Sequence, residues 1–273
     1  MSRSASYIKR GAALVIVAVL IGLLAFWGFR ILNFYRAVNG DISPQLPEAD
    51  EYPVRGIDIS YYQGEINWAE LSAHDHVSFA YIKATEGSKH KDERFEENWK
   101  GARSAGVYVG AYHFVSFESS GETQADNFIS LVPKQANSLP PVLDLELYNE
   151  AIIENPPSKE QVHEILDVMI EKLESYYGVK PIIYTSSNLY MKYILGSYRD
   201  CGLWMSNTSC EPLADWTFWQ YSFEGYLPGF SMDNIPVDLN VYNGSEQDFY
   251  KEFGLSPDFA VYGKKTVTDE NGG

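Results

Sequence analysis

Hydrophobic and polar positions divide the chain into one long apolar run near the N-terminus and a larger region where short apolar runs alternate with amphipathic ones. Short apolar runs rich in Val, Ile, Tyr and Phe are typical of buried strands. Eight such runs predict strands at residues 54–60, 77–83, 107–114, 141–146, 182–185, 203–206, 218–222 and 237–241.

The segments between these runs predict helices at residues 67–71, 92–105, 122–131 and 158–177. The last helix is the clearest, because Ser158 and Gln161 form a capping box and Gly178 follows the final turn. Strands that alternate with helices predict a parallel sheet, and eight strands predict a barrel. The late connections are too short for full helices. We therefore expect an α/β fold, an irregular TIM-like (β/α) barrel with eight strands and fewer than eight helices.

The N-terminal apolar run covers residues 11–29, nineteen residues without a charge. A helix of this length spans about 28 Å, close to the hydrocarbon thickness of a bilayer. Bulky residues follow the run where a signal-peptide cleavage site needs small ones. We expect a single-pass signal anchor at residues 11–31, with residues 1–10 in the cytoplasm and the rest outside the cell. A buried core helix is the alternative interpretation.

The remaining boundaries follow from composition. Residues 32–53 contain three prolines and predict a linker, residues 54–256 form the predicted barrel, and residues 257–273 predict a polar, disordered tail. Residues 1–50 carry five Lys or Arg and three Asp or Glu. The others carry 16 and 34, a formal charge of −18. This acidity disfavours nucleic acid as a partner.

The tripeptide Asp144-Leu145-Glu146 is the strongest chemical signal, because it ends a buried apolar run. In a strand the side chains at i and i+2 leave the same face, about 6.6 Å apart. Two carboxylates this close raise the pKa of one of them. A raised carboxyl beside an ionised one suits acid-catalysed cleavage of a glycosidic bond. A solvated loop carrying two acids is the alternative.

Two further acids, Asp58 and Asp238, are also embedded in apolar residues, which is costly unless the carboxylate is paired or functional. Over roughly residues 54–254 the chain contains, in this order, the segments GIDISYYQG, FAYIKATEG, FEENWKGARSAGVYVGAYHF, PPVLDLE, IIYTS, FWQYS and VDLNVYNG. In this order they resemble glycoside hydrolase family 25, the muramidases or Chalaropsis-type lysozymes.

The resemblance implies a peptidoglycan hydrolase that cleaves the β-1,4 bond between N-acetylmuramic acid and N-acetylglucosamine. Glu146 would be the general acid/base, and Asp144 its ionised partner. In related sugar hydrolases with an Asp-x-Glu end, the Asp orients the substrate's 2-acetamido group, and the resemblance implies this role for Asp144. Asp58 and Asp238 would complete the acidic cleft, all four acids lying at carboxyl ends of strands. Residues expected to line the cleft are Tyr62, Tyr112, Tyr184, Trp204, Trp219 and Gln220.

Other side chains are expected to be structural. His113 faces away from Tyr112 on its strand and is predicted to pack, and Lys83 with Glu86 is predicted to fix a loop. The five His residues form no cluster, so we expect no metal and no cofactor. Cys201 and Cys210 are the only cysteines, and in an extracellular domain an even pair predicts a disulfide.

This chain departs from the family pattern at one place. Residues 205–208 are Met-Ser-Asn-Thr, where the family usually has a small-residue/aromatic pattern. This affects the expected contacts of one sugar subsite. The partners expected are peptidoglycan strands and the membrane, and the protein is expected to be monomeric. The alternative function is a membrane-anchored peptidoglycan-binding module that has lost turnover.

Overall fold

The computed structural model describes residues 3–38, 46–73, 77–230 and 235–260. Eight strands form a closed barrel, because the pairing of β1 with β2 joins the two ends of the sheet, and this confirms the predicted fold class. The short β3 (His90–Lys91) adds to the end of β2 outside the barrel. The barrel strands are β1 (Arg55–Ile59), β2 (Phe79–Glu86), β4 (Tyr108–Phe114), β5 (Val142–Leu145), β6 (Ile182–Ser186), β7 (Leu203–Ser206), β8 (Phe218–Gly225) and β9 (Val237–Tyr242).

Strand β9 departs from the predicted parallel sheet, because it runs antiparallel to both of its neighbours, β8 and β1. A parallel crossover needs a dozen or more residues, usually with a helix. The connection between β8 and β9 is too short for one. The amino end of β9 therefore lies at the edge where the other strands have their carboxyl ends. Asp238 reaches that edge from the start of its strand, and the prediction that it follows a carboxyl end is wrong.

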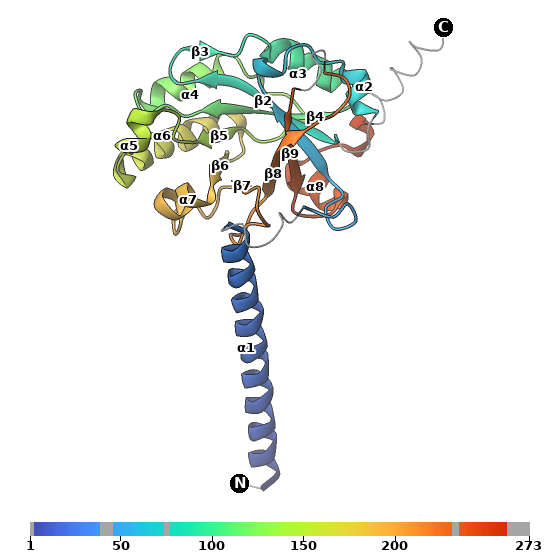
Figure 1. Ribbon diagram of the computed structural model, residues 1–273, viewed down its shortest axis with the longest axis vertical. Helices are drawn as coiled ribbons and strands as arrows, with labels where there is room; N and C mark the ends of the chain where they lie inside the picture. The colour runs from blue at the N-terminus through green and yellow to red at the C-terminus, as the bar shows by residue number, and fades with distance from the viewer. Residues whose placement is uncertain (1–2, 39–45, 74–76, 231–234, 261–273) are drawn as a thin grey trace.

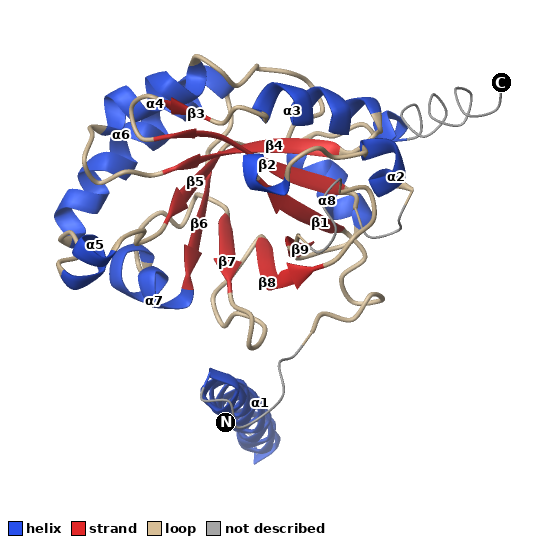
Figure 2. Ribbon diagram, turned by 45° about the horizontal axis from the view of Figure 1, so that its top comes forward, coloured by secondary structure: helices blue, strands red, loops and turns tan. Residues whose placement is uncertain are grey.

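The predicted helices are present as α2 (Trp68–Ser72), α3 (Phe95–Ser104), α4 (Gly121–Ile129) and α6 (Lys159–Tyr177). The Ser158 capping box and the left-handed Gly178 bound α6 as expected. Figure 2 shows α3, α4 and α6 on one side of the barrel, whereas short segments flank β6 to β8. Elements not predicted are the 3₁₀ turn η1 (Tyr61–Gln63), α5 (Glu150–Glu154), α7 (Ser187–Leu189), the π-helical η2 (Tyr190–Ile194) and α8 (Glu246–Phe253).

Aromatic rings fill the interior of the barrel, and α8 closes the end that carries the amino ends of the parallel strands. Phe249 of α8 packs on Phe79 and Tyr108, the first residues of β2 and β4. Gly110 is required by this packing, since a Cβ atom there would lie 2.1 Å from the Tyr81 ring. The opposite end of the barrel is left for the acidic side chains.

The predicted tail boundary at residue 256 is wrong. Phe259 packs on the ring of Tyr108 at 5.2 Å between centroids, and the Arg103 guanidinium lies 4.9 Å from the Phe259 ring centroid. Because the Phe259 ring packs on the barrel, the folded domain extends to at least residue 260. Residues 261–273 of the predicted tail lie outside the described residues.

The N-terminal helix α1 (Arg3–Val38) is continuous and projects from the barrel in Figure 1. Its segment Val15–Leu32 has a mean hydropathy of 2.5 and is unburied, so it is long and apolar enough to cross a membrane. The helix continues six residues past Leu32, which corrects the predicted start of the linker at residue 32. Near its end, the Arg30 guanidinium forms an ion pair of 3.0 Å with Glu211 of the β7–β8 loop.

Candidate active site

A cavity of about 180 Å³ opens at the carboxyl edge of the parallel strands and collects all four predicted acids. Asp58 comes from β1, Asp144 from β5, Glu146 directly follows β5, and Asp238 comes from β9. Four carboxyls in one small cavity repel each other, so protons must be held among them. The other residues of the lining are Ser60, Tyr62, Lys83, Tyr112, Phe114, Val142, Tyr184, Trp204 and Gln220.

Asp144 and Glu146 lie on the same side of the β5 end, as the strand alternation predicts. Burial raises the pKa of Asp144 well above its usual range, and the charges of Glu146 and Asp58 add to this. Among the described residues, the buried Asp144 Oδ1 has no hydrogen-bond partner. Burial also raises the pKa of Glu146, which is half-buried, while a hydrogen bond with Tyr184 and the charge of the Lys83 ammonium act in the opposite direction. Burial therefore shifts both carboxyls toward the protonated form.

This result corrects the expected electrostatics of the pair. The sequence predicts that Asp144 stays ionised and raises the pKa of Glu146 through its field. In the structure, burial is the main cause for both groups, and Asp144 is the more deeply buried, at 8% exposure. An unpartnered carboxyl in a low-dielectric site keeps its proton until a hydrogen-bond donor or a positive charge stabilises the carboxylate.

Asp58 and Asp238 face each other directly across the β1–β9 pair, and their carboxyls are hydrogen-bonded to each other. Burial raises the pKa of Asp238 to about 8, and the charge of Asp58 adds to this effect. Burial raises the pKa of Asp58 to about 6, although amide N–H groups from Asn240 and Gln220 favour its ionised form. The pair therefore carries one proton and one negative charge at neutral pH.

An amide network holds Asp58 in place. Asn240 Nδ2 donates to Asp58 Oδ2 at 2.8 Å, and Gln220 Nε2 donates to the same oxygen at 2.9 Å. The Tyr184 hydroxyl donates to Gln220 Oε1 at 2.7 Å, and Trp204 Nε1 donates to Asn240 Oδ1 at 2.8 Å. Sequence reasoning missed Asn240, although it lies two residues after Asp238 and so shares its face of β9.

Lys83 is a lining residue that the sequence interpretation assigned only to a loop. Its ammonium pairs with Glu86 at 2.7 Å, as predicted. It also lies 4.8 Å from the centroid of the Phe114 ring, another residue of the cavity lining. A nearly buried lysine in an apolar strand is the signal that identifies it. Its charge lowers the pKa of both Asp144 and Glu146 and so partly offsets their burial.

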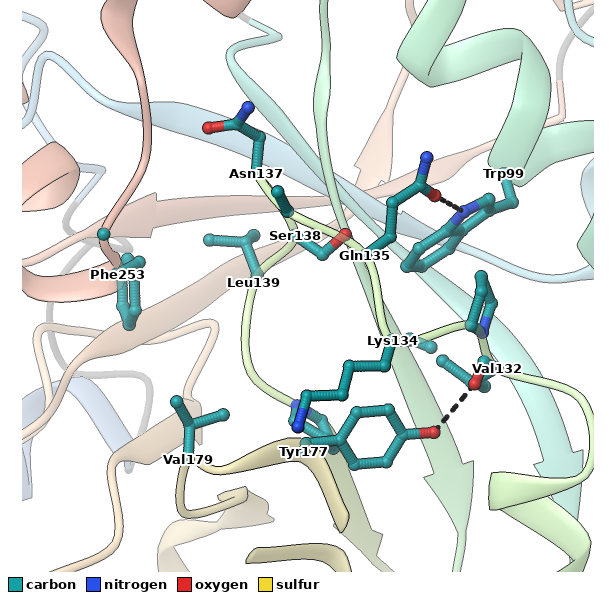
Figure 3. Close-up of a pocket in the computed structure, with 15 residues that line it drawn as sticks. Trp99, Val132, Lys134, Gln135, Asn137, Ser138, Leu139, Tyr177, Val179 and Phe253 are labelled. Carbon is teal, nitrogen blue, oxygen red and sulfur yellow. Dashed lines mark hydrogen bonds between the residues drawn. The ribbon is translucent and has the colours of Figure 1, made fainter.

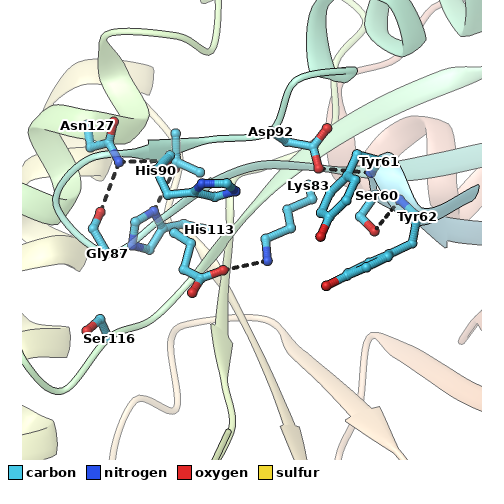
Figure 4. A network of polar contacts seen from close by, with 12 residues as sticks. Ser60, Tyr61, Tyr62, Lys83, Gly87, His90, Asp92, His113, Ser116 and Asn127 are labelled. Carbon is cyan, nitrogen blue, oxygen red and sulfur yellow. Dashed lines mark hydrogen bonds and ion pairs between the residues drawn. The ribbon is translucent and has the colours of Figure 1, made fainter. Parts of the chain in front are cut away.

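Four of the aromatic residues expected in the cleft line the cavity: Tyr62, Tyr112, Tyr184 and Trp204. Tyr62 is 66% exposed and packs on Tyr61, whose backbone N–H donates to Asp92 (Figure 4). Flat exposed rings at the rim of an acidic cavity are suited to contact with sugars.

Trp219 is placed outside the cavity, which corrects its assignment to the cleft. It is buried against Tyr52 and Trp216, and its Nε1 donates to the Asn207 carbonyl at 2.7 Å. Trp219 lies outside the cavity because adjacent residues on a strand face opposite sides and its neighbour Gln220 faces the cavity. His113 is buried as predicted, between Thr85 at 2.7 Å and Gln124 at 3.0 Å.

Cys201 and Cys210 are both free thiols, so the structure contradicts the predicted disulfide. Cys201 precedes β7, and Cys210 follows it. The Cys210 backbone N–H donates to the side chain of Asn207, the residue directly after β7. The four residues of β7 alone extend about 13 Å, whereas a disulfide needs Cα atoms about 4.4–6.8 Å apart.

Two other cavities are larger, but their polar groups are not arranged for this chemistry. A cavity of about 310 Å³ lies by the segment that precedes β5. Figure 3 shows Trp99 bonded to Gln135 and Tyr177 bonded to the Val132 carbonyl there. One of about 470 Å³ lies beside η2 and β7, with Asp215 as its only carboxylate among the described residues. Within the described ranges, no three His, Cys, Asp or Glu side chains are arranged to hold a metal ion.

The model of glycosyl hydrolases family 25 matches residues 57–230. Lysozyme M1 of Streptomyces globisporus is 36% identical over 211 residues, which cover 72% of this chain and 70% of that protein. A family 25 glycosyl hydrolase from Bacillus anthracis has 42% identity and a TM-score of 0.72, over 78% of this chain and 98% of that one. The lysozyme structure from Streptomyces coelicolor has 31% identity and a TM-score of 0.64, with the same coverage. The chain therefore belongs to glycosyl hydrolases family 25 and is a glycoside hydrolase of the muramidase class.

Proposed function

We propose that the protein is an N-acetylmuramidase that cleaves the β-1,4 bond from N-acetylmuramic acid to N-acetylglucosamine in peptidoglycan, with Glu146 as general acid/base. The observation that carries the proposal is the half-buried Glu146 carboxyl beside the buried Asp144, in a cavity lined by four acids. A carboxyl with a raised pKa can hold a proton at neutral pH and deliver it to a leaving oxygen.

Asp144 acts on the 2-acetamido group in this proposal. Its buried Oδ1 has no hydrogen-bond donor among the described residues, and an acetamido N–H is a donor of the right kind. Binding of that N–H stabilises the Asp144 carboxylate, and its field then keeps the proton on Glu146. The acetamido oxygen attacks the anomeric carbon while Glu146 protonates the leaving oxygen. Glu146 then takes a proton from the water that completes hydrolysis.

The opposed Asp58–Asp238 pair supports the reaction from the other side of the cavity. Its one negative charge favours positive charge that develops on the sugar ring, and its shared proton limits repulsion of the other acids. Since all four carboxyls face one cavity, the site favours an active hydrolase over a binding module that has lost turnover.

Product analysis tests the proposed bond. The full-length protein in detergent micelles should digest purified peptidoglycan, and borohydride reduction of the fragments should convert muramic acid, not glucosamine, to its alcohol. Mass spectrometry of the reduced fragments distinguishes the two. Reduced glucosamine ends would identify a glucosaminidase, and intact glycan after prolonged digestion would favour the binding module.

We further propose that α1 anchors the enzyme in the cell membrane as a single-pass signal anchor at residues 11–31, with the barrel outside the cell as a monomer. The support is the length, apolar composition and exposure of Val15–Leu32. Exposed Leu, Ile, Val and Phe over such a length are costly in water and are stable in a bilayer. An anchored barrel would hydrolyse wall strands within reach of the membrane surface.

Carbonate extraction checks the anchor. The full-length protein should stay in the membrane pellet after treatment at alkaline pH, because hydrophobic insertion does not depend on charge. A variant that lacks residues 11–31 should be recovered in the soluble fraction. Recovery of the full-length chain as a soluble species, or a mature N-terminus near residue 40, would contradict a signal anchor.

A further inference from the structure

The barrel contacts α1 at the level where the apolar span of this helix ends. The Arg30 guanidinium forms an ion pair of 3.0 Å with Glu211 and donates to the Pro212 carbonyl at 3.3 Å, both in the β7–β8 loop. Arg30 lies two residues before Leu32, the last residue of the span, so about 3 Å of helix rise separates the two. With α1 across a bilayer, this loop lies at the boundary between the hydrocarbon and the lipid headgroups.

A second part of the barrel lies beside this loop. It consists of α7, η2 and the residues that follow to Arg199, and we call residues 187–199 the η2 segment. In Figure 1 and in Figure 2, α7 lies at the lower edge of the barrel, near the end of α1. Residues 195–199 also line the cavity of about 470 Å³ together with residues 215–217 of the β7–β8 connection. The η2 segment and the loop that contacts α1 therefore belong to one side of the barrel.

The η2 segment combines exposed apolar side chains with positive charge. Met191 is 63% exposed and Leu195 is 46% exposed. Lys192 and Arg199 are also exposed, and the segment contains no Asp or Glu, although the whole chain has a formal charge of −16. Exposed apolar side chains beside Lys and Arg are typical of protein surfaces that lie in a membrane interface.

The nearest acids do not cancel this positive charge. Asp200 pairs with Lys180 at 2.6 Å, and Glu211 pairs with Arg30. Asp215, on the β7–β8 side of the cavity, carries one further negative charge. The two cations of the η2 segment outnumber it, so this side of an otherwise acidic barrel favours an anionic partner.

We propose that the η2 segment is a second membrane contact of the protein: Met191 and Leu195 enter the headgroup layer, and Lys192 and Arg199 bind the phosphates of anionic phospholipids. The inference rests on the proposed anchoring by α1. A single helix leaves the barrel free to turn and tilt about its end. A second contact fixes the orientation of the barrel, so the cavity with the four acids meets glycan strands at a constant height above the bilayer.

A lipid bilayer is the occupant that the observations favour, because the anchor itself brings this surface to it. The ion pair of Arg30 holds the β7–β8 loop at the headgroups, and the neighbouring η2 segment then reaches the bilayer without any other partner. Tyr190 and Tyr198 of the segment are half-buried. Tyr is enriched at membrane interfaces, where its ring is in the apolar layer and its hydroxyl is in contact with water.

Photocrosslinking to lipid tests the contact. The full-length protein carries the photoreactive residue benzoylphenylalanine in place of Met191, or in place of Lys100 as the control, and is reconstituted in nanodiscs of phosphatidylcholine and phosphatidylglycerol. Mass spectrometry after irradiation should find lipid adducts at residue 191 and none at residue 100. The Lys100 side chain is 75% exposed, but it lies on α3, on the side of the barrel away from α1 (Figure 1).

A third variant separates this contact from the anchor. It carries the photoreactive residue in place of Leu24, which is 74% exposed within the apolar span of α1. Adducts at residue 24 without adducts at residue 191, or equal yields at residues 191 and 100, would overturn the second contact and leave the anchor in place. Absence of adducts at residue 24 would contradict the anchor, and the second contact would be wrong with it.

Removal of charge tests the class of lipid. Each basic residue strengthens contact with an anionic surface by about fivefold, so Lys192→Gln with Arg199→Gln should weaken the contact by about 30-fold and lower the adduct yield at residue 191. Lys89→Gln with Lys100→Gln is the matched control, since it makes the same change of net charge on the other side of the barrel. It should leave the yield unchanged.

The lipid composition gives the last comparison. In nanodiscs of phosphatidylcholine alone, the substitutions at residues 192 and 199 should have little effect on the adduct yield, because the surface carries no net charge. An equal loss from both pairs of substitutions, or the same loss in both kinds of nanodisc, would show that Lys192 and Arg199 do not bind anionic lipid, and the proposal would be wrong.

Discussion

Glu146→Gln should reduce the rate of muropeptide release by about 10²–10⁴-fold, the range expected when a general acid is removed. Glutamine has nearly the same volume and can still bond to its neighbours, but it has no acidic proton for the leaving oxygen. Sugar alkoxides are poor leaving groups, so the loss should lie toward the upper end of this range. The measurement is product release from purified peptidoglycan at the pH optimum of the wild type.

The fold of this variant should be intact, since Glu146 is half-buried and directly follows β5 rather than lying within it. The control is Glu164→Gln on the exposed face of α6, which makes the same chemical change outside the cavity. It should keep wild-type turnover. A folded Glu146→Gln protein with near wild-type release would move the acid assignment to Asp58 or Asp238.

The strand-end acids could be predicted because their signal is local. Asp144-Leu145-Glu146 follows an apolar run, and strand alternation alone puts both carboxyls on one face. The eight strands were predictable for the same reason, since each is a short apolar run between turn-forming residues. The same alternation rule excludes Trp219 from the cavity once Gln220 is placed in it.

The direction of β9 and the fate of the cysteines depend on where segments lie in space. No local pattern distinguishes a parallel from an antiparallel last strand, and only the length of the β8–β9 connection carries a signal. Cys201 and Cys210 are close in sequence, but β7 lies between them and separates them. A short strand inside a proposed disulfide loop is reason enough to doubt that disulfide.

Of the features of the site, the raised pKa of Asp144 was the hardest to predict from the sequence. Its pKa depends on burial and on an unpartnered oxygen, and both follow from how the eight barrel strands and their side chains meet around the cavity. The sequence shows that two acids are adjacent but not which of them lies deeper. This difference in depth decides which carboxyl has the more strongly raised pKa.

Asp144→Asn should abolish most turnover while it stabilises the fold. We expect muropeptide release to fall by about 10²–10³-fold, comparable to the loss of one preorganised electrostatic group. The amide carries no negative charge, so it cannot hold the acetamido N–H as strongly or keep the proton on Glu146. Product release from purified peptidoglycan measures this loss, with Glu164→Gln again as the control.

Asp144→Asn lowers turnover but should raise the free energy of unfolding, and this gain depends on pH. Because burial raises the pKa of Asp144 in the folded protein above that of an unfolded aspartate, about 3.9, the folded state holds its proton more tightly. Below that pH both states are protonated and Asp144 costs nothing. As pH rises, the unfolded state ionises freely while the folded state resists, so the stability of the wild type falls relative to the variant.

Thermal unfolding of the full-length protein in detergent at pH 4 and pH 7 measures this difference. At pH 4 the wild type and Asp144→Asn should melt at nearly the same temperature. At pH 7 the variant should melt higher by at least about 2–4 °C, the shift expected from about 1 kcal/mol in a domain of this size. Because Glu164 lies on an exposed helix face, Glu164→Gln should show no such change with pH. A lower melting temperature for Asp144→Asn at pH 7 would mean that Asp144 is ionised and paired in the folded protein, and the proton would then have to reside on Glu146 before any sugar binds.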